Sequence, residues 1–379
     1  MSRASALSRR PQRPPRVVLA VSGHGFGHAV RCAVVAGALL RRGARVLLRS
    51  EAPVWLFPAG VEAVAAPGDW PLDVGVAQHD GLDFDIDETR RRWDQFAATF
   101  DAHAAAEAQL LRELQADVLL GDIPPLAFAA AARAGIPGLA MGNFGWDWIY
   151  APWPGFETAI ACIRRGYRQA SRLLRLPLRS STPDAFEAFS VIEDVPLVAR
   201  TARRPRAAVR AELGLPDTRR VVLLSFGGFP SHDLDLHGLA KATNYTFLVT
   251  PPLSWGVLEP GPHMLRFAEQ PHDYVSLLAA CDAVVTKPGY GIVADCLANR
   301  VPILYTDRGP FREYDVLVEA IHRLGHGRYV PRADVLAGAL APHLDALLGS
   351  PAAWQPLRLD GAEVVAERVL DCLELLKTR

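Results

Sequence analysis

Short apolar runs alternate along the chain with longer stretches in which alanine and leucine recur at helical spacing. In the first half, strands are expected at residues 17–20, 46–49, 118–120 and 139–142. The intervening helices are expected at residues 31–42, 104–114 and 126–134. Strands that alternate with helices in this way are typical of a doubly wound α/β domain with a mostly parallel sheet.

A second series of the same kind follows, with strands expected at residues 221–225, 245–250, 264–267, 283–286 and 303–305. The pattern therefore predicts two Rossmann-like domains joined near residues 197–204. Residues 1–15 are expected to be a disordered basic tail, 16–200 the first domain and 201–360 the second. Residues 361–379 are expected to form a C-terminal helix that can cross back to the first domain.

Composition bears on which partners and which compartment are expected. The chain has 379 residues, and its 41 basic and 41 acidic side chains cancel, so its charge favours neither nucleic acid nor an anionic membrane as a partner. No apolar run approaches the roughly 20 residues of a membrane-spanning helix. Its five cysteines lie far apart in apolar surroundings, as buried thiols of a reducing compartment do, so a cytoplasmic protein is expected.

The segment Val-Ser-Gly-His-Gly-Phe-Gly-His-Ala at residues 21–29 lies between the first strand and the first helix. Its glycines Gly23, Gly25 and Gly27 would let a ligand approach backbone N–H groups, and His24 and His28 are titratable. The G-x-G-x-G spacing departs from the dinucleotide fingerprint, which disfavours NAD binding. We expect an acceptor-side wall here, with His24 as a general base and His28 in packing or binding.

Asp122 ends another strand of the same predicted sheet. Because strand ends of a parallel sheet share an edge, Asp122 is expected to orient His24 and to stabilise its imidazolium. A helix cap is the alternative role, since Ile-Pro-Pro follows Asp122 directly.

Two glycine-containing loops of the second half are candidates for holding a phosphate group. Ser225, Gly227 and Gly228 follow the first strand of that half, where main-chain donors can face a phosphate. The more specific segment runs from a strand into a helix, where N–H groups can bind a diphosphate. Its candidate donor-binding residues are Lys287, Gly289, Tyr290, Gly291 and Asp295, the last as a ribose ligand. A solvated lysine and a helix-dipole aspartate are the structural alternatives.

Three further segments carry polar residues. Asp307, Arg308 and Glu313 follow a strand of the second half and are candidate donor contacts, with a surface ion-pair cluster as the alternative. Asn143, Trp146 and Asp147 are acceptor-side candidates, with a buried aromatic cluster between the domains as the alternative. The Asp-rich stretch at residues 68–92 is expected to be a solvated acceptor-side loop, with a metal site as the alternative, and its spacing is too irregular for a calcium loop.

Taken in order, these motifs resemble those of GT-B glycosyltransferases, and most closely the amino-terminal glycosyltransferase-like region of plant L-arabinokinases and its stand-alone bacterial relatives. The resemblance runs from residue 16 to about 371 through GHGFGHAVR, GDIPPLAFAAAARAGI, NFGWDWIY, VIEDVPLVAR, LLSFGG and KPGYGIVADCLANRVPILYTDR with FREYDVL. It implies a GT-B fold, a nucleotide-sugar donor held by the second domain and an acceptor held by the first. By this resemblance, His24 and Asp122 of this chain match the general base and its acidic partner in the inverting UDP-sugar-dependent enzymes of this fold. Many of them carry Glu where this chain has Asp295.

The expected activity is therefore an inverting, metal-independent transfer of a hexosyl or pentosyl group from a nucleotide-sugar, with UDP-sugar favoured, to a hydroxyl acceptor. No metal and no organic cofactor are expected. The alternatives are a nucleotide-sugar epimerase or hydrolase on the same fold, and a non-catalytic UDP-sugar-binding module. Sugar phosphorylation is not expected, because no Gly-x-x-x-x-Gly-Lys-Ser/Thr loop occurs in the chain.

Overall fold

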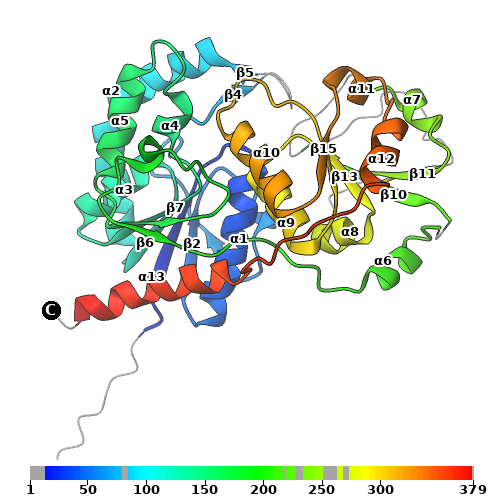
Figure 1. Cartoon of the computed structure of the whole chain (residues 1–379). Coiled ribbons are helices and arrows are strands. Elements are labelled where there is room, and N and C mark those ends of the chain that lie inside the picture. The colour runs from blue at the N-terminus through cyan, green and yellow to red at the C-terminus, as the bar shows by residue number, and fades with distance from the viewer. Residues whose placement is uncertain are drawn as a thin grey trace, which may run out of the picture.

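The computed structural model describes residues 13–78, 84–216, 218–226, 234–250, 263–267 and 273–377. Within them the chain forms two parallel sheets, each covered by helices, and the two units lie side by side (Figure 1). The α/β class and the two Rossmann-like halves predicted from the alternating pattern are confirmed.

The first sheet has the strand order β3-β2-β1-β6-β7-β8-β9, and all its neighbours are parallel. Its strands are β1 (Arg16–Val21), β2 (Arg45–Arg49), β3 (Val61–Ala63), β6 (Val118–Asp122), β7 (Gly138–Gly142), β8 (Arg172–Arg175) and β9 (Ile192–Asp194). Side chains alternate along β1, so Val17 and Leu19 join one apolar core and Val18 and Ala20 another. Both faces of this sheet are consequently buried.

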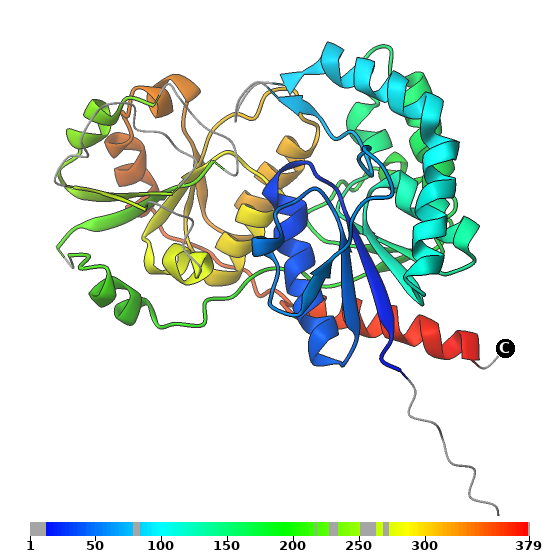
Figure 2. The ribbon, with the colours of Figure 1, turned by 180° about the vertical axis from the view of Figure 1, so that it is seen from behind.

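Helices on the two faces account for those cores. The helices of the first half are α1 (Gly25–Arg41), α2 (Ile86–Glu113), α3 (Pro125–Ala134), α4 (Trp146–Tyr150) and α5 (Glu157–Tyr167). Helices α2, α3 and α5 pack together over one face. Helix α13 (Gly361–Lys377) lies against α1 on the other face, beneath the first unit in Figure 1 and in the reverse view of Figure 2. Glu363 of α13 forms ion pairs with Arg41 and Arg42 at the end of α1.

The second sheet has the order β12-β11-β10-β13-β14-β15, again with parallel neighbours. Its strands are β10 (Arg220–Leu224), β11 (Tyr245–Val249), β12 (Met264–Arg266), β13 (Ala283–Thr286), β14 (Ile303–Tyr305) and β15 (Gly327–Tyr329). Its helices are α6 (Arg206–Glu212), α7 (Leu236–Ala240), α8 (Tyr274–Ala280), α9 (Tyr290–Asn299), α10 (Glu313–Leu324), α11 (Arg332–Leu336) and α12 (Ala341–Leu348). Among the described residues, no helix is long and apolar enough to cross a membrane.

The Asp-rich stretch differs from the expected continuous loop. Residues 79–83 lie outside the described residues, but a short antiparallel pair, β4 (Ala77–Gln78) and β5 (Phe84–Asp85), flanks them. Helix α2 already begins at Ile86, because Asp85 caps it by accepting a hydrogen bond from the backbone N–H of Glu88 at 2.8 Å. The sequence pattern placed this helix start too late.

Candidate active site

The two units meet where α1 and α9 begin. Helix α1 starts at Gly25, which has a φ of +70°, so Gly25 and Gly27 lie in its first turn and the expected glycine loop is short. A Cβ added to Gly291 in the first turn of α9 would lie 3.6 Å from the Cα of Gly27. The N-terminal ends of two helices, one from each unit, thus lie in contact at Gly27 and Gly291. Neither helix has a side-chain cap, so first-turn N–H groups are available at this junction.

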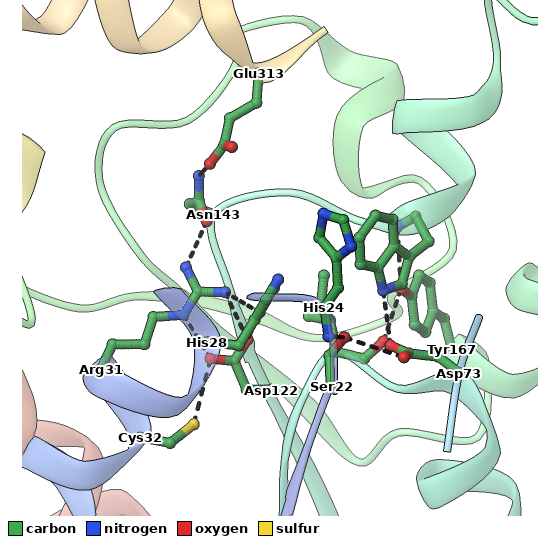
Figure 3. A network of polar contacts seen from close by, with 12 residues as sticks. Ser22, His24, His28, Arg31, Cys32, Asp73, Asp122, Asn143, Tyr167 and Glu313 are labelled. Carbon is green, nitrogen blue, oxygen red and sulfur yellow. Dashed lines mark hydrogen bonds and ion pairs between the residues drawn. The ribbon is translucent and has the colours of Figure 1, made fainter. Parts of the chain in front are cut away.

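The carboxylate of Asp122 contacts His28 and Arg31, both on α1. Its Oδ1 lies 3.0 Å from Nδ1 of His28, and its two oxygens accept hydrogen bonds from Nε and Nη2 of Arg31, each at 2.5 Å. Cys32 is a third neighbouring residue, whose Sγ donates to Oδ2 of Asp122 at 3.3 Å. Burial opposes ionisation of Asp122, but the charges of Arg31 and His28 and their hydrogen bonds hold its pKa below the usual range. Figure 3 shows Asp122 beside His28 and Arg31, with His24 to one side.

The expected hydrogen bond between His24 and Asp122 is therefore wrong. Strands β1 and β6 are in register so that Val21 pairs with Asp122, which places the carboxylate beneath the helix that follows β1. Positions 28, 31 and 32 share one face of this helix because they are three and four residues apart. That face points at Asp122, whereas His24 precedes the helix as its N-cap residue.

His24 contacts a different segment. Its Nδ1 accepts a hydrogen bond of 3.2 Å from the backbone N–H of Val76. The backbone N–H of His24 donates to Oγ of Ser22 at 3.3 Å. The imidazole ring packs edge-to-face with Trp146 at a centroid distance of 5.3 Å. It also stacks with Phe311 of the second unit at a centroid distance of 6.4 Å. Burial lowers the pKa of His24 well below its ordinary value, and the charges of His28, Arg308 and Lys287 lower it further.

A chain of hydrogen bonds crosses from one unit to the other. Nη1 of Arg31 donates to Oδ1 of Asn143 at 2.7 Å, and Nδ2 of Asn143 donates to Oε1 of Glu313 at 2.7 Å. The other carboxylate oxygen of Glu313 accepts from Nη1 of Arg308 at 2.8 Å, which also donates to the carbonyl of Pro288 at 2.9 Å. The predicted acceptor-side residue Asn143 and the predicted donor-side residues Arg308 and Glu313 thus form one network with Asp122.

The aromatic segment has a different role from the one expected. Trp146 is fully buried, so it lines the core beneath the histidines and offers no open face to a sugar. Its Nε1 donates to Oδ2 of Asp73 at 2.9 Å, and Oδ1 of the same carboxylate accepts from Ser22 at 3.0 Å. Asp147 is buried as well and pairs with Arg164 at 3.1 Å, on the side of α5. The alternative of a buried aromatic cluster is confirmed for Trp146, and the acceptor contact predicted for Asp147 is wrong in this structure.

Several donor-side candidates gather at the carboxyl ends of β10, β13 and β14. Lys287 is buried directly after β13, Gly289 is the N-cap residue of α9, and Ser225 shares a 2.6 Å hydrogen bond with the hydroxyl of Tyr274. Tyr290 is buried under Arg31, whose guanidinium carbon lies 4.8 Å from the ring centroid.

Four further candidates are Asp307, Gly227, Gly228 and, on the acceptor side, Gly23. Asp307 accepts a hydrogen bond from Tyr329 at 2.7 Å. Gly227 and Gly228 lie outside the described residues. Exposed Gly23 packs so closely on Glu51 that an added Cβ would lie 2.5 Å from Oε2 of that residue.

Asp295 does not face the donor side. Its buried carboxylate accepts hydrogen bonds from the backbone N–H, Nε and Nη2 of Arg200 at 2.8, 2.9 and 2.6 Å. Burial raises the pKa of this carboxyl, and Arg200 offsets part of that effect. Since Arg200 belongs to the segment that joins the two units, Asp295 anchors this connection. The predicted ribose contact is wrong, because three donors already occupy the carboxylate.

Sequence reasoning missed Arg31 and Asp73. Arg31 follows His28 by three residues, a helical spacing that could have marked it as a neighbour of the same partner. No local signal distinguishes Asp73 from the other aspartates of its stretch, because its burial depends on Ser22 and Trp146 from distant segments. Among the described residues, no three His, Cys, Asp or Glu side chains are grouped so that they could hold a metal ion.

Comparison with known proteins places this geometry in context. No protein-family model matches the chain. It is 31% identical over 353 residues to L-arabinokinase of Arabidopsis thaliana, an alignment that covers 91% of this chain and 33% of that protein. The chain thus spans about one third of the length of that relative. It is also 22% identical over 274 residues to an uncharacterised glycosyltransferase of Methanopyrus kandleri, covering 69% of this chain and 77% of the other.

Solved structures share the fold over nearly the whole chain. The glycosyltransferase SnogD from Streptomyces nogalater has a TM-score of 0.58 at 18% identity, with 95% of each chain covered. Medicago truncatula UGT71G1, complexed with UDP-glucose, has a TM-score of 0.60 at 12% identity, with 95% of this chain and 98% of that chain covered. The arrangement of two Rossmann-like domains in these proteins is the same, which confirms the predicted fold class.

Proposed function

We propose that the chain is a GT-B glycosyltransferase that transfers a sugar from a UDP-sugar to a hydroxyl acceptor by an inverting, metal-independent reaction, and that His28 is the general base. The contact between Nδ1 of His28 and Asp122 carries this proposal. It replaces His24 as base and keeps Asp122 as the acidic partner.

The hydrogen-bond partners of His28 define the role of its ring. Nδ1 is 3.0 Å from an Asp122 oxygen and 3.1 Å from Nη2 of Arg31. A carboxylate can only accept and a guanidinium can only donate. Arg31 already donates to Asp122 and Asn143, so we assign the Nδ1 proton of His28 to its hydrogen bond with Asp122. Nε2 then carries the lone pair that a general base requires, and it points away from Asp122.

The second domain supplies groups suited to a diphosphate. Lys287 and Arg308 carry positive charge at the ends of β13 and β14, and α9 begins beside them with uncapped N–H groups. A helix N-terminus and two cations favour an anionic group in this position. The relatives complexed with UDP or UDP-glucose support uridine as the nucleotide.

In the proposed reaction the acceptor hydroxyl loses its proton to Nε2 of His28, and its oxygen attacks the anomeric carbon of the donor sugar. The bond from that carbon to the diphosphate oxygen breaks on the opposite side, so the configuration inverts. The electron pair leaves with the nucleoside diphosphate, whose charge Lys287, Arg308 and the N–H groups of α9 stabilise. Asp122 compensates the charge that His28 gains.

The proposal also includes a cytoplasmic setting. The five cysteines are unpaired thiols, which supports a reducing compartment.

A screen of UDP-, GDP- and dTDP-sugars by thermal shift identifies the donor, because a ligand that binds the folded protein raises its apparent stability. The stabilising donor is then incubated with a panel of hydroxyl acceptors, and products are identified by mass spectrometry and by the anomeric configuration in NMR. Inverted glycoside is the expected product. Release or conversion of the sugar without acceptor would instead show a hydrolase or epimerase, and binding without any turnover would show a sugar-nucleotide-binding module.

A further inference from the structure

We propose that His24 is a hydrogen-bond donor, which presents Nε2–H to the diphosphate of the nucleotide-sugar, and that the two histidines of the segment therefore have opposite proton roles. The inference rests on the proposed glycosyl transfer. It assigns a substrate contact to His24, which has no role in the reaction once His28 is the base.

The backbone N–H of Val76 determines the tautomer of His24. This N–H lies 3.2 Å from Nδ1 and can only donate, so Nδ1 must hold a lone pair. In a neutral imidazole the single proton then belongs to Nε2. His28 has the reverse arrangement, since its Nδ1 faces the Asp122 carboxylate and its Nε2 is the acceptor. A ring with its proton on Nε2 cannot remove a proton from an acceptor through that atom.

The segment that holds His24 is firmly attached. Gly75 has a φ of +58°, and an added Cβ at this position would lie 2.7 Å from Cβ of His24, so only glycine allows so close an approach. The carbonyl of Gly75 accepts a hydrogen bond from the hydroxyl of Tyr150, and the N–H of Ala77 donates to Oγ1 of Thr89 at 2.9 Å. Val76 is thus held between two anchored residues, and the tautomer of His24 does not depend on a mobile partner.

The neighbours of His24 in the second domain indicate what it binds. Phe311 stacks on the ring, and the charges of Arg308 and Lys287 act on it from the loops that follow β14 and β13. A neutral N–H donor beside two cations matches a ligand rich in anionic oxygens, and in a nucleotide-sugar that group is the diphosphate. The same two cations disfavour an imidazolium at this position, which is the form that a general base must adopt after proton transfer.

Two conservative variants separate the donor role from a structural role. In His24→Gln the amide nitrogen can occupy the place of Nε2 and donate, whereas in His24→Asn the amide oxygen can replace Nδ1 and still accept from Val76. We expect His24→Gln to bind UDP within about threefold of the wild-type protein and His24→Asn to bind at least tenfold more weakly. His28→Gln, the matched control, should bind UDP normally and lose turnover.

Both measurements use the full chain. UDP affinity is measured by calorimetry, and turnover is measured with the donor and acceptor that the screens under Proposed function identify. Normal UDP binding by His24→Asn together with weak binding by His24→Gln would show that only the Val76 contact matters and would overturn the inference. Loss of turnover in His24→Gln as complete as in His28→Gln, at unchanged UDP affinity, would make His24 the base and would overturn it too. If the binding pattern holds but no acceptor is glycosylated, the inference stands and the proposed transfer fails.

Discussion

The Nδ1 atom of His28 lies 3.0 Å from Oδ1 of Asp122, one turn into the helix that follows the first strand, and Arg31 holds the same carboxylate from the next turn. Asp122 thus contacts the second histidine of the Gly-His-Gly-Phe-Gly-His segment. Each of these three side chains is almost completely buried, so the pair is shielded from bulk solvent.

Replacement of His28 by Ala or Gln should lower kcat by about 10²- to 10⁴-fold, the usual contribution of a general base. UDP affinity should change little, because the base contacts the acceptor. The measurement is steady-state turnover together with calorimetric UDP binding. Turnover within threefold of the wild-type value would refute the assignment of His28.

Asp122→Asn should lower kcat less than loss of His28 does, since Nε2 remains in place while the Nδ1 proton is no longer directed by a charge. It should also destabilise the protein by about 3 kcal/mol, because the buried guanidinium of Arg31 loses its counter-ion. Chemical denaturation and turnover measure the two effects separately. Unchanged stability would mean that Arg31 finds another partner.

Gly27→Ala is expected to reduce activity without reducing stability. A Cβ at this position would meet no atom within 4 Å, so the fold should accept it, and alanine favours a helix. The added methyl group would nevertheless occupy the open space beside the first turn of α1, where the substrates are proposed to meet. We expect at least a tenfold fall in kcat/KM at an unchanged melting temperature.

Gly37→Ala is the matched control, because it lies in the same helix and its Cβ would make ordinary contacts, 3.4 Å from the flexible end of Arg41 and 4.0 Å from Cγ of Pro58. It should retain normal activity. Equal activity of the two variants would indicate that substrates do not approach α1 at Gly27.

Asp73 should make stability depend on pH. Burial raises the pKa of this carboxyl to about 7, although hydrogen bonds from Ser22 and Trp146 oppose the shift. Between its ordinary pKa near 4 and this value, the folded protein holds a proton that the unfolded chain has released. The free energy of unfolding should therefore fall as the pH rises through this window, by on the order of a few kcal/mol in total.

Asp73→Asn reproduces the protonated form, so it should match the wild-type protein at pH 5 and exceed its stability at pH 8. Urea denaturation at both pH values gives the comparison, with Asp94→Asn on the exposed side of α2 as the control. Burial also raises the pKa of Glu51, so some slope should persist. If the free energy of unfolding of Asp73→Asn falls with pH as steeply as that of the wild-type protein, Asp73 is not the main cause of the pH dependence.

Asp295→Ala should destabilise the fold by about 3 kcal/mol and leave UDP affinity of the folded protein unchanged. Removal of this carboxylate leaves Arg200 without its buried partner and also leaves a linker N–H unsatisfied. Glu319→Ala on the exposed side of α10 is the control, because a surface ion pair contributes little. A tenfold loss of UDP affinity at normal stability would instead support the ribose contact first predicted for Asp295.

The strands of the two sheets could be predicted closely from the chain, as β1, β2, β13 and β14 illustrate, because a strand buried on both faces must be a short apolar run. Edge strands such as β3 and β9 escaped notice, because they are three residues long and partly exposed. The start of α2 was missed for a related reason: its first turns are highly charged and show no apolar stripe.

At the site, the residue types and the segments were predictable, and the partners were not. A strand-end position determines which edge of the sheet a residue reaches, so Asp122 was expected near the glycine-histidine segment, beside His24. Which histidine meets the carboxylate depends on the rotation of α1 about its axis, and that rotation is set by packing against β1, α9 and α13. Likewise, nothing local to Asp295 shows that Arg200 occupies it.

The sequence by itself determined the two parallel sheets, the glycine turns at their carboxyl edges and the kinds of side chain placed there, because period, apolar runs and glycine conformation are local properties of a chain. Tertiary structure alone decided which groups His24 and His28 contact. A hydrogen bond depends on distances of a few tenths of an ångström between segments far apart in sequence, and here Val76 and Asp122 supply the partners that distinguish the two rings.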